Sequence, residues 1–113
     1  MVSQRYQEFV DHLRQAVLAG PGVTERSERA AVASRAGALS GGGTPAEGVV
    51  PGAIAGFVDK VAGRAYTVTD DDVHALRQAG YSEDAIFEIT ASAAMGAALG
   101  RLERGLAALR GEV

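Results

Sequence analysis

The densest group of possible metal ligands in the chain is the run Asp70-Asp71-Asp72, with His74 two residues further on. Carboxylates and imidazole are both ligands of divalent cations. On a helix, however, these four side chains point around the axis and not at one point. Acidic residues in a first helical turn are already explained by the positive end of the helix dipole. We therefore expect no metal site at these residues.

Acid–base chemistry would be available to Tyr66 with Lys60 and Asp59, because a tyrosine of lowered pKa beside a lysine can transfer protons. A tyrosine that packs at a helix end with its hydroxyl in water is much commoner. His12 lies next to Leu13 in a helical pattern and is compatible with a partly buried neutral histidine. We expect no catalytic residue among these groups.

The chain has no cysteine. This removes disulfides, thiolate nucleophiles, thiolate metal sites and iron–sulfur ligation together. The run Gly41-Gly42-Gly43-Thr44 lacks the lysine and the preceding strand of a phosphate-binding loop. We expect no cofactor, and we expect residues 40–48 to form a flexible glycine-rich loop.

Length, charge and composition limit the class of protein. The 113 residues fit a single domain, residues 1–113, and the 47% of apolar residues is ordinary for a globular protein. A net charge of −3 gives no general attraction for nucleic acid. The N-terminus lacks the apolar region of a signal peptide, and no stretch approaches the roughly 20 apolar residues that cross a membrane. We expect a cytoplasmic protein with neither nucleic acid nor membrane as a partner.

Apolar periodicity predicts an all-α fold of about five helices. The first helix, residues 3–18, carries a stripe that we expect to be buried, formed by Tyr6, Phe9, Val10, Leu13, Ala16 and Val17. Thr24 is the expected N-cap of a second helix that ends near residue 39 and is only weakly amphipathic, with Ala30, Ala31, Val32 and Ala33 as its main apolar content. A third helix begins at Pro51 and ends near residues 63–65, with core positions Ile54, Phe57, Val58 and Val61.

A short fourth helix has clear signals at both ends. Thr69 is its expected N-cap, and Val73 and Leu76 supply its buried side. Gly80 ends it in a Schellman cap, which places Tyr81 where an apolar side chain is usually buried.

The last helix begins after Ser82 and continues to about residue 110, which makes it roughly 28 residues or 42 Å long. A compact chain of this length has a diameter of roughly 35 Å, so this helix overhangs, bends or packs on another subunit. Its face of small residues lets another helix come close, either within the chain or from a second subunit. The candidate interface residues are Ser92, Met95, Gly96, Leu99 and Gly100.

Residues 54–109 contain F-V-D-K-V-A, then Y-T-V-T-D-D-D-V-H-A-L-R-Q-A-G-Y-S-E-D-A-I-F-E-I-T, then an alanine-rich run that closes on R-L-E-R-G-L. Over about half of the chain this pattern resembles the carboxymuconolactone decarboxylase and AhpD-like alkylhydroperoxidase superfamily. The part that matches best is the helix-turn-helix at residues 68–88. The resemblance implies an AhpD-like helical bundle with a long C-terminal helix, whose members assemble as dimers, trimers or hexamers.

The resemblance also implies where a peroxidase of this superfamily keeps its chemistry, a C-x-x-C pair with a nearby histidine and glutamate upstream of the matching region. Residues 25–39 hold that place here and contain neither cysteine nor histidine. No catalytic residue is carried over, and we expect a non-catalytic or degenerate member that is a homo-oligomeric helical scaffold. Two alternatives stay open: a divergent decarboxylase-type lyase with a pocket between subunits, and a protein–protein interaction module.

Overall fold

The computed structural model describes residues 4–41 and 49–111, and all regular structure in these ranges is helical. The elements in chain order are α1 (Gln4–Leu18), α2 (Arg26–Leu39), α3 (Gly52–Gly63), the 3-10 turn η1 (Ala65–Thr67), α4 (Asp70–Gln78) and α5 (Glu83–Leu109). The predicted all-α fold with a long C-terminal helix is confirmed. Of the predicted flexible loop, residues 42–48 lie outside the described ranges.

The ends of α4 follow the predicted signals. The Thr69 hydroxyl accepts a hydrogen bond from the Asp72 amide at 3.3 Å, and the Asp72 carboxylate accepts one from the Thr69 amide at 2.9 Å, which together form a capping box. At the other end Gly80 has a φ of 102°, a conformation that glycine adopts without steric cost. The Tyr81 amide then donates to the Leu76 carbonyl at 3.1 Å, as in a Schellman cap.

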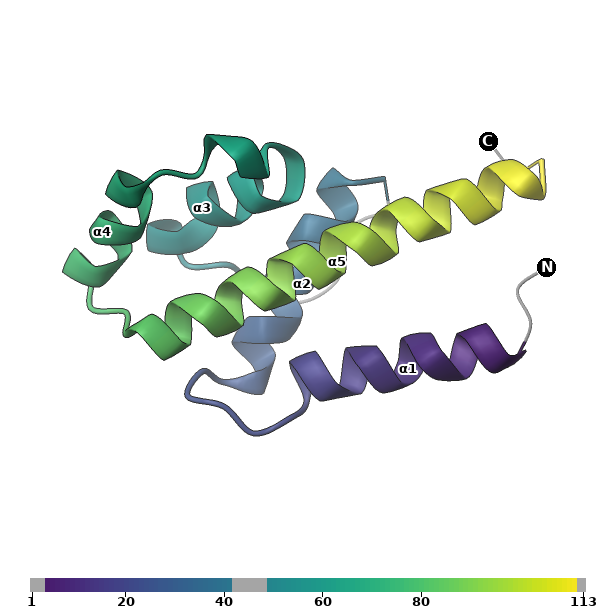
Figure 1. Cartoon of the computed structure of the whole chain (residues 1–113), viewed down its shortest axis with the longest axis horizontal. Coiled ribbons are helices and arrows are strands. Elements are labelled where there is room, and N and C mark those ends of the chain that lie inside the picture. The colour runs from purple at the N-terminus through teal and green to yellow at the C-terminus, as the bar shows by residue number, and fades with distance from the viewer. Residues whose placement is uncertain (1–3, 42–48, 112–113) are drawn as a thin grey trace.

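The core forms where α2, α3 and α4 pack around the N-terminal half of α5 (Figure 1). α1 lies apart from this core, beside the C-terminal half of α5. The buried apolar residues of the core are Val32, Ala36, Ile54, Phe57, Val58, Ala62, Leu76, Ile86, Ile89, Ala93 and Ala97. The predicted buried positions of the third and fourth helices are therefore largely confirmed, with Val61 and Val73 at the edge of the core.

The most extensive helix contact is the crossing of α2 and α5, where the two backbones touch. A Cβ atom built on Gly96 would lie 2.2 Å from the Ala33 carbonyl oxygen, and one built on Gly100 would lie 2.5 Å from the Gly37 carbonyl oxygen. Neither distance leaves room for a side chain. Ser92, one turn earlier on the same face, is fully buried. This face of small residues therefore serves a close approach within the chain.

α5 overhangs the core, the first of the three outcomes that its length predicted. Its 27 residues correspond to about 40 Å, close to the longest dimension of the molecule, which measures 45 × 28 × 23 Å. Residues 101–105 are exposed. The last turns of α5 thus extend past α2 and α3 and lie beside α1 (Figure 1).

The prediction of a buried stripe on the first helix is wrong. No residue of α1 is buried, and Tyr6 and Phe9 are 61% and 67% exposed. Val10 and Val17 are half-buried. The apolar side of α1 meets only the end of α5 and a small part of α2, and these two neighbours are too few to cover it.

The loop between α1 and α2 is held by a carboxylate from α5. Glu88 accepts hydrogen bonds from the amides of Val23 and Thr24, both at 2.9 Å, and from the Thr24 hydroxyl at 2.6 Å. The hydroxyl bond first, and then the amide bonds, hold the pKa of Glu88 below its usual range. The prediction that Thr24 caps α2 is therefore wrong, because its hydroxyl is engaged by α5, and Glu25 occupies the N-cap with no side-chain bond.

Arg29 holds the same loop from the side of α2. Its residue is only 3% exposed. One guanidinium nitrogen donates to the Val17 carbonyl at the end of α1 at 2.9 Å, and the other donates to the Thr24 carbonyl at 3.4 Å. Glu88 and Arg29 together therefore set the position of α1, which its own packing fixes only weakly.

Replacing Gly96 by leucine is expected to destabilise the fold by about 3 kcal/mol or more, because α2 and α5 would have to move apart. Gly105→Leu in the same helix is the matched control. Nothing lies within 4 Å of a Cβ at Gly105, so leucine there is expected to raise stability slightly through its better helix propensity. Thermal unfolding followed by circular dichroism measures both, and equal melting temperatures for the two variants would contradict the close crossing.

Replacing Glu88 by glutamine is expected to lower the stability by about 1 kcal/mol at pH 7. The side-chain amide of glutamine has only one oxygen, so its NH2 group would face a backbone N–H group that also donates. A carboxyl whose pKa is lowered by folding stabilises the folded state above its ordinary pKa of about 4.5, and this contribution is lost as the pH falls through the lower folded value. The melting temperatures of wild type and Glu88→Gln should thus differ at pH 7 and converge as the pH falls below 4.5 and through the lower folded pKa. Glu103→Gln is the control, because no described residue forms an ion pair with Glu103. A difference in melting temperature between wild type and Glu88→Gln that stays constant with pH would show that the Glu88 carboxylate does not hold the loop.

Candidate functional site

The residues that suggested acid–base chemistry are not brought together. The Lys60 ammonium lies 2.9 Å from the Asp72 carboxylate, and this ion pair ties α3 to the start of α4. The same bond from Lys60 is the main reason that the pKa of Asp72 is lowered. Tyr66 is 87% exposed in η1. Lys60 therefore serves the packing of α4, and Tyr66 projects into solvent.

Asp59 is paired with Arg35 of α2, and not with Lys60 or Tyr66, with which the sequence grouped it. The Arg35 guanidinium donates twice to the carboxylate, at 2.6 and 2.9 Å. These bonds lower the pKa of Asp59 and raise that of Arg35, so both groups are held in their charged forms. A bidentate pair between α2 and α3 is a structural clamp. A carboxyl that donates protons near neutral pH would need its pKa raised.

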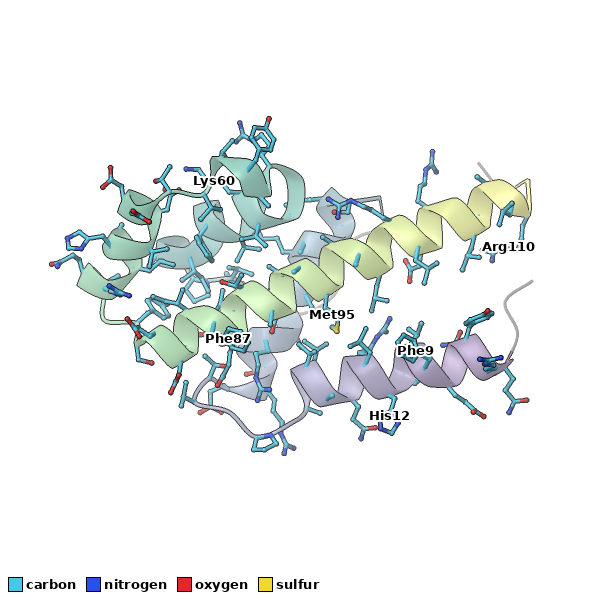
Figure 2. The ribbon with its side chains drawn as sticks, viewed as in Figure 1. Phe9, His12, Lys60, Phe87, Met95 and Arg110 are labelled. Carbon is cyan, nitrogen blue, oxygen red and sulfur yellow. The ribbon has the colours of Figure 1, made fainter. Side chains whose placement is uncertain are left out.

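No metal site is found in the residues that the structure describes, where no group of three or more histidine, aspartate or glutamate side chains converges. His74 is exposed on α4. His12 is also exposed and lies on the side of α1 that faces away from α5 (Figure 2). Within residues 4–41 and 49–111, neither histidine has a set of partners that would orient it for catalysis or metal binding.

The feature that stands out is the exposed apolar surface on α1 and the end of α5, which we call the arm surface. Phe9 of α1 and Met95 of α5 lie on the facing sides of the two helices (Figure 2). The large apolar residues that remain exposed here are Tyr6 (61%), Phe9 (67%), Leu13 (40%), Leu102 (43%) and Leu109 (83%). Scattered single apolar residues are normal on a protein surface, whereas a continuous patch marks an interaction site.

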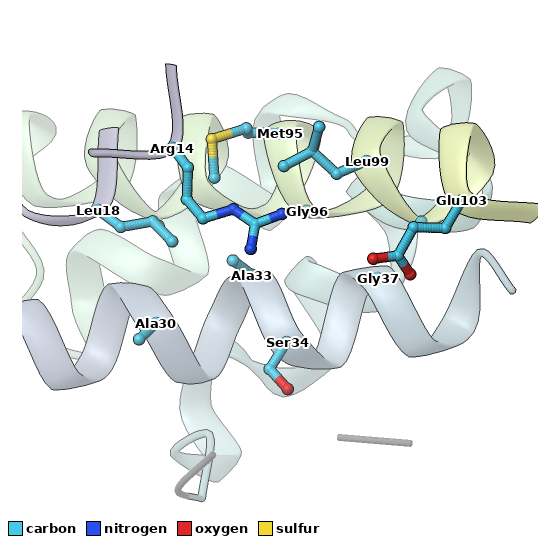
Figure 3. Close-up of a pocket in the computed structure, with 11 residues that line it drawn as sticks. Arg14, Leu18, Ala30, Ala33, Ser34, Gly37, Met95, Gly96, Leu99 and Glu103 are labelled. Atoms are coloured by element: carbon cyan, nitrogen blue, oxygen red, sulfur yellow. The ribbon is translucent and has the colours of Figure 1, made fainter. Parts of the chain in front are cut away.

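A cavity of about 260 Å³ lies at the inner end of the arm surface, where α1 approaches the crossing of α2 and α5 (Figure 3). Small and apolar residues make its floor and wall, among them Ala33, Gly37, Met95, Gly96 and Leu99. Arg14 and Glu103 reach over it from α1 and α5 (Figure 3). Neither forms an ion pair with the other or with any further described residue, so the opening presents two unpaired charges of opposite sign.

The structure divides the five predicted interface residues into two groups. Ser92, Gly96 and Gly100 are buried on the side of α5 that meets α2. Met95 and Leu99 lie beside this face, in the wall of the cavity that Gly96 and Gly100 also line, and at the inner end of the arm surface. Only the second group continues into an exposed surface.

Several residues that position this site were missed in the sequence. The anchor Glu88 and the buried Arg29 join segments that are 64 and 12 residues apart, and no local pattern predicts such a pairing. One signal was present: Gly22 stands directly before the anchored amides, and a Cβ there would lie 2.6 Å from the Glu88 carboxylate. A glycine at that place permits the close approach of the two groups.

α5 is by length and composition able to cross a membrane, contrary to the prediction that no segment is. The difference arises because alanine raises the mean hydropathy of a window that has no long run of large apolar residues. Half of that window is buried inside the fold, and the core helix of a soluble protein passes the same test, so the observation is weak evidence for a membrane span.

Comparison with known proteins found no match for this chain. No family model matches the chain, and no curated protein or solved structure is significantly similar to it.

Proposed function

We propose that the protein is a non-catalytic, self-associating helical scaffold, and a cysteine-free member of the carboxymuconolactone decarboxylase-like superfamily. The family part of the proposal is supported by the residue pattern at 54–109. The helix-ending residues of this pattern, such as Thr69, Gly80 and Ser82, lie at the ends of α4 and at the start of α5.

The observation that carries self-association is the state of α1. This helix has a clear apolar stripe, yet none of its residues is buried in the chain. An amphipathic helix gains most of its stability from packing its apolar face against other elements. α1 has its neighbours on one side only, so a second copy would supply the missing contact surface.

The electrostatics of the chain support a non-catalytic role. Among the described residues, three carboxyl groups have shifted pKa values, those of Asp59, Asp72 and Glu88, and all three are shifted downward by hydrogen bonds that join helices or loops. Catalytic carboxyls that act as acids near neutral pH are shifted upward by burial or by a second carboxylate. Each of the shifted groups here is explained by a structural bond.

A second candidate function is favoured by the cavity. An Arg14 guanidinium above an apolar floor is suited to a small ligand with a carboxylate, and Glu103 would face a donor or cationic group on the same ligand. The volume of about 260 Å³ is slightly below the roughly 300–1,000 Å³ of typical ligand pockets, so the ligand would be small. The alternative of a divergent lyase with a pocket at a subunit boundary would place its substrate here.

Native mass spectrometry of the gently purified protein tests both candidates in one spectrum. The scaffold is expected to appear as a homo-oligomer at micromolar concentration, with no mass beyond that of the subunits. An oligomer that carries a bound molecule, lost in Arg14→Ala, would favour the ligand-binding alternative. A monomer across the micromolar range would reject self-association.

A further inference from the structure

We infer that the arm surface is an interface between two copies of this chain, in which α1 and the C-terminal half of α5 from each copy form a four-helix bundle. The inference rests on the proposed self-association and adds the surface and the partner.

The spacing on α5 is that of a coiled-coil seam. Met95, Leu99, Leu102, Leu106 and Leu109 follow one another at intervals of four, three, four and three residues. An apolar residue every 3.5 positions on average is the pattern by which helices pack along their length in coiled coils and four-helix bundles. This seam runs beside the face of small residues that meets α2, and at its inner end Met95 and Leu99 line a cavity together with Gly96 and Gly100.

α1 has the same spacing. Tyr6, Val10, Leu13 and Val17 are separated by four, three and four residues, and Phe9 widens the stripe. Two helices of one chain thus carry bundle seams next to each other, since α1 and α5 are in contact. A pair of helices alone leaves most of these apolar residues in water, whereas four helices can enclose them in a common core.

Burial along the seam shows which end is open. Met95 at the inner end is 7% exposed, whereas Leu102 and Leu109 toward the outer end are 43% and 83% exposed. On α1, Tyr6 at the outer end is 61% exposed and Val17 at the inner end is half-buried. The chain itself closes the inner end, and the partner would cover the outer end.

The flat face of α1 and the end of α5 is about half of the area that one partner of a standard interface contributes, before the relief of the side chains is added. Tyr6 and Phe9 alone leave roughly 200–300 Å² of side chain exposed, at 150–250 Å² for a whole aromatic residue. Two helices about 10 Å in diameter and about 22 Å long present a flat face of about 450 Å², to which side-chain relief adds. Each partner of a standard interface contributes about 800 Å².

Charge favours a second copy over a strongly acidic or basic partner. α1 carries two basic residues, Arg5 and Arg14, and two acidic residues, Glu8 and Asp11, so its charges sum to zero. The end of α5 also has both signs, with Glu103 between Arg101 and Arg104. A face that carries both signs of charge can meet an identical face across a two-fold axis, where basic groups of one copy can approach acidic groups of the other.

The double variant Leu102→Glu/Leu109→Glu tests the surface, because it places two carboxylates in the open part of the seam at positions that are not buried in the monomer. Sedimentation equilibrium is expected to show the association constant falling at least about 100-fold, while circular dichroism remains that of the wild type. Phe87→Glu is the matched control, since Phe87 is 72% exposed on the same helix but outside the arm surface, and it should leave association unchanged.

A second measurement does not depend on a charged substitution. Because the chain has no cysteine, Leu102→Cys and Phe87→Cys each introduce a single thiol. Alkylation of the cysteine at position 102 should slow at least about tenfold as the protein concentration rises through the dissociation constant, whereas alkylation at position 87 should not change.

The outcomes separate this inference from the proposal on which it rests. A wild-type protein that is monomeric rejects self-association and the interface together. An oligomer that survives Leu102→Glu/Leu109→Glu with unchanged affinity, and whose cysteine at position 102 reacts equally fast at all concentrations, keeps self-association and rejects the arm surface. An oligomer that is disrupted by Phe87→Glu instead would place the interface at the other end of α5.

Discussion

The backbone contact between α2 and α5 is the constraint on which the rest of the structure depends. Because Gly96 lies against Ala33, and Gly100 against Gly37, the two helices approach more closely than helices with larger side chains at the contact can. Such a crossing buries little side-chain volume at its centre. The core is therefore completed by α3 and α4, which supply the large apolar residues Ile54, Phe57 and Leu76.

The close crossing also determines what α5 does on its other side. One face of the helix is occupied by α2 and α3, so the seam from Met95 to Leu109, in which Leu102 and Leu109 are exposed, is left for a different partner. Within the chain that partner is α1, and α1 covers only the inner end. A helix that is longer than its own core has an end that must be solvated or shared, and the leucines at this end favour sharing.

α1 is attached by polar interactions more than by packing. Glu88 and Arg29 hold the loop that follows it, through bonds to Thr24 and Val17, while its apolar stripe remains largely in water. Charge-assisted hydrogen bonds fix direction well and contribute modest net stability. This arrangement orients α1 along α5 without burying it, which is how a helix would be presented to a partner that completes its burial.

The sequence by itself determined the helices and most of their ends, because these depend on neighbours three or four residues away. The capping box at Thr69, the glycine cap at Gly80 and the period of the apolar residues are local signals, and the structure confirms them. The absence of cysteine likewise excludes thiol chemistry without any structure. The family resemblance stays a proposal, since it rests on the residue pattern alone.

Only the tertiary structure decided which faces meet. An amphipathic stripe shows that a helix has an apolar side, but not whether the chain has enough neighbours to cover it, so the burial of α1 was predicted wrongly. Thr24 has the features of an N-cap, and Glu88, 64 residues away, takes its hydroxyl because a charged acceptor forms the stronger bond. The cavity beneath Arg14 and Glu103 and the open seam beside it arise from the angle at which three helices cross, and that angle is a property of the packed molecule.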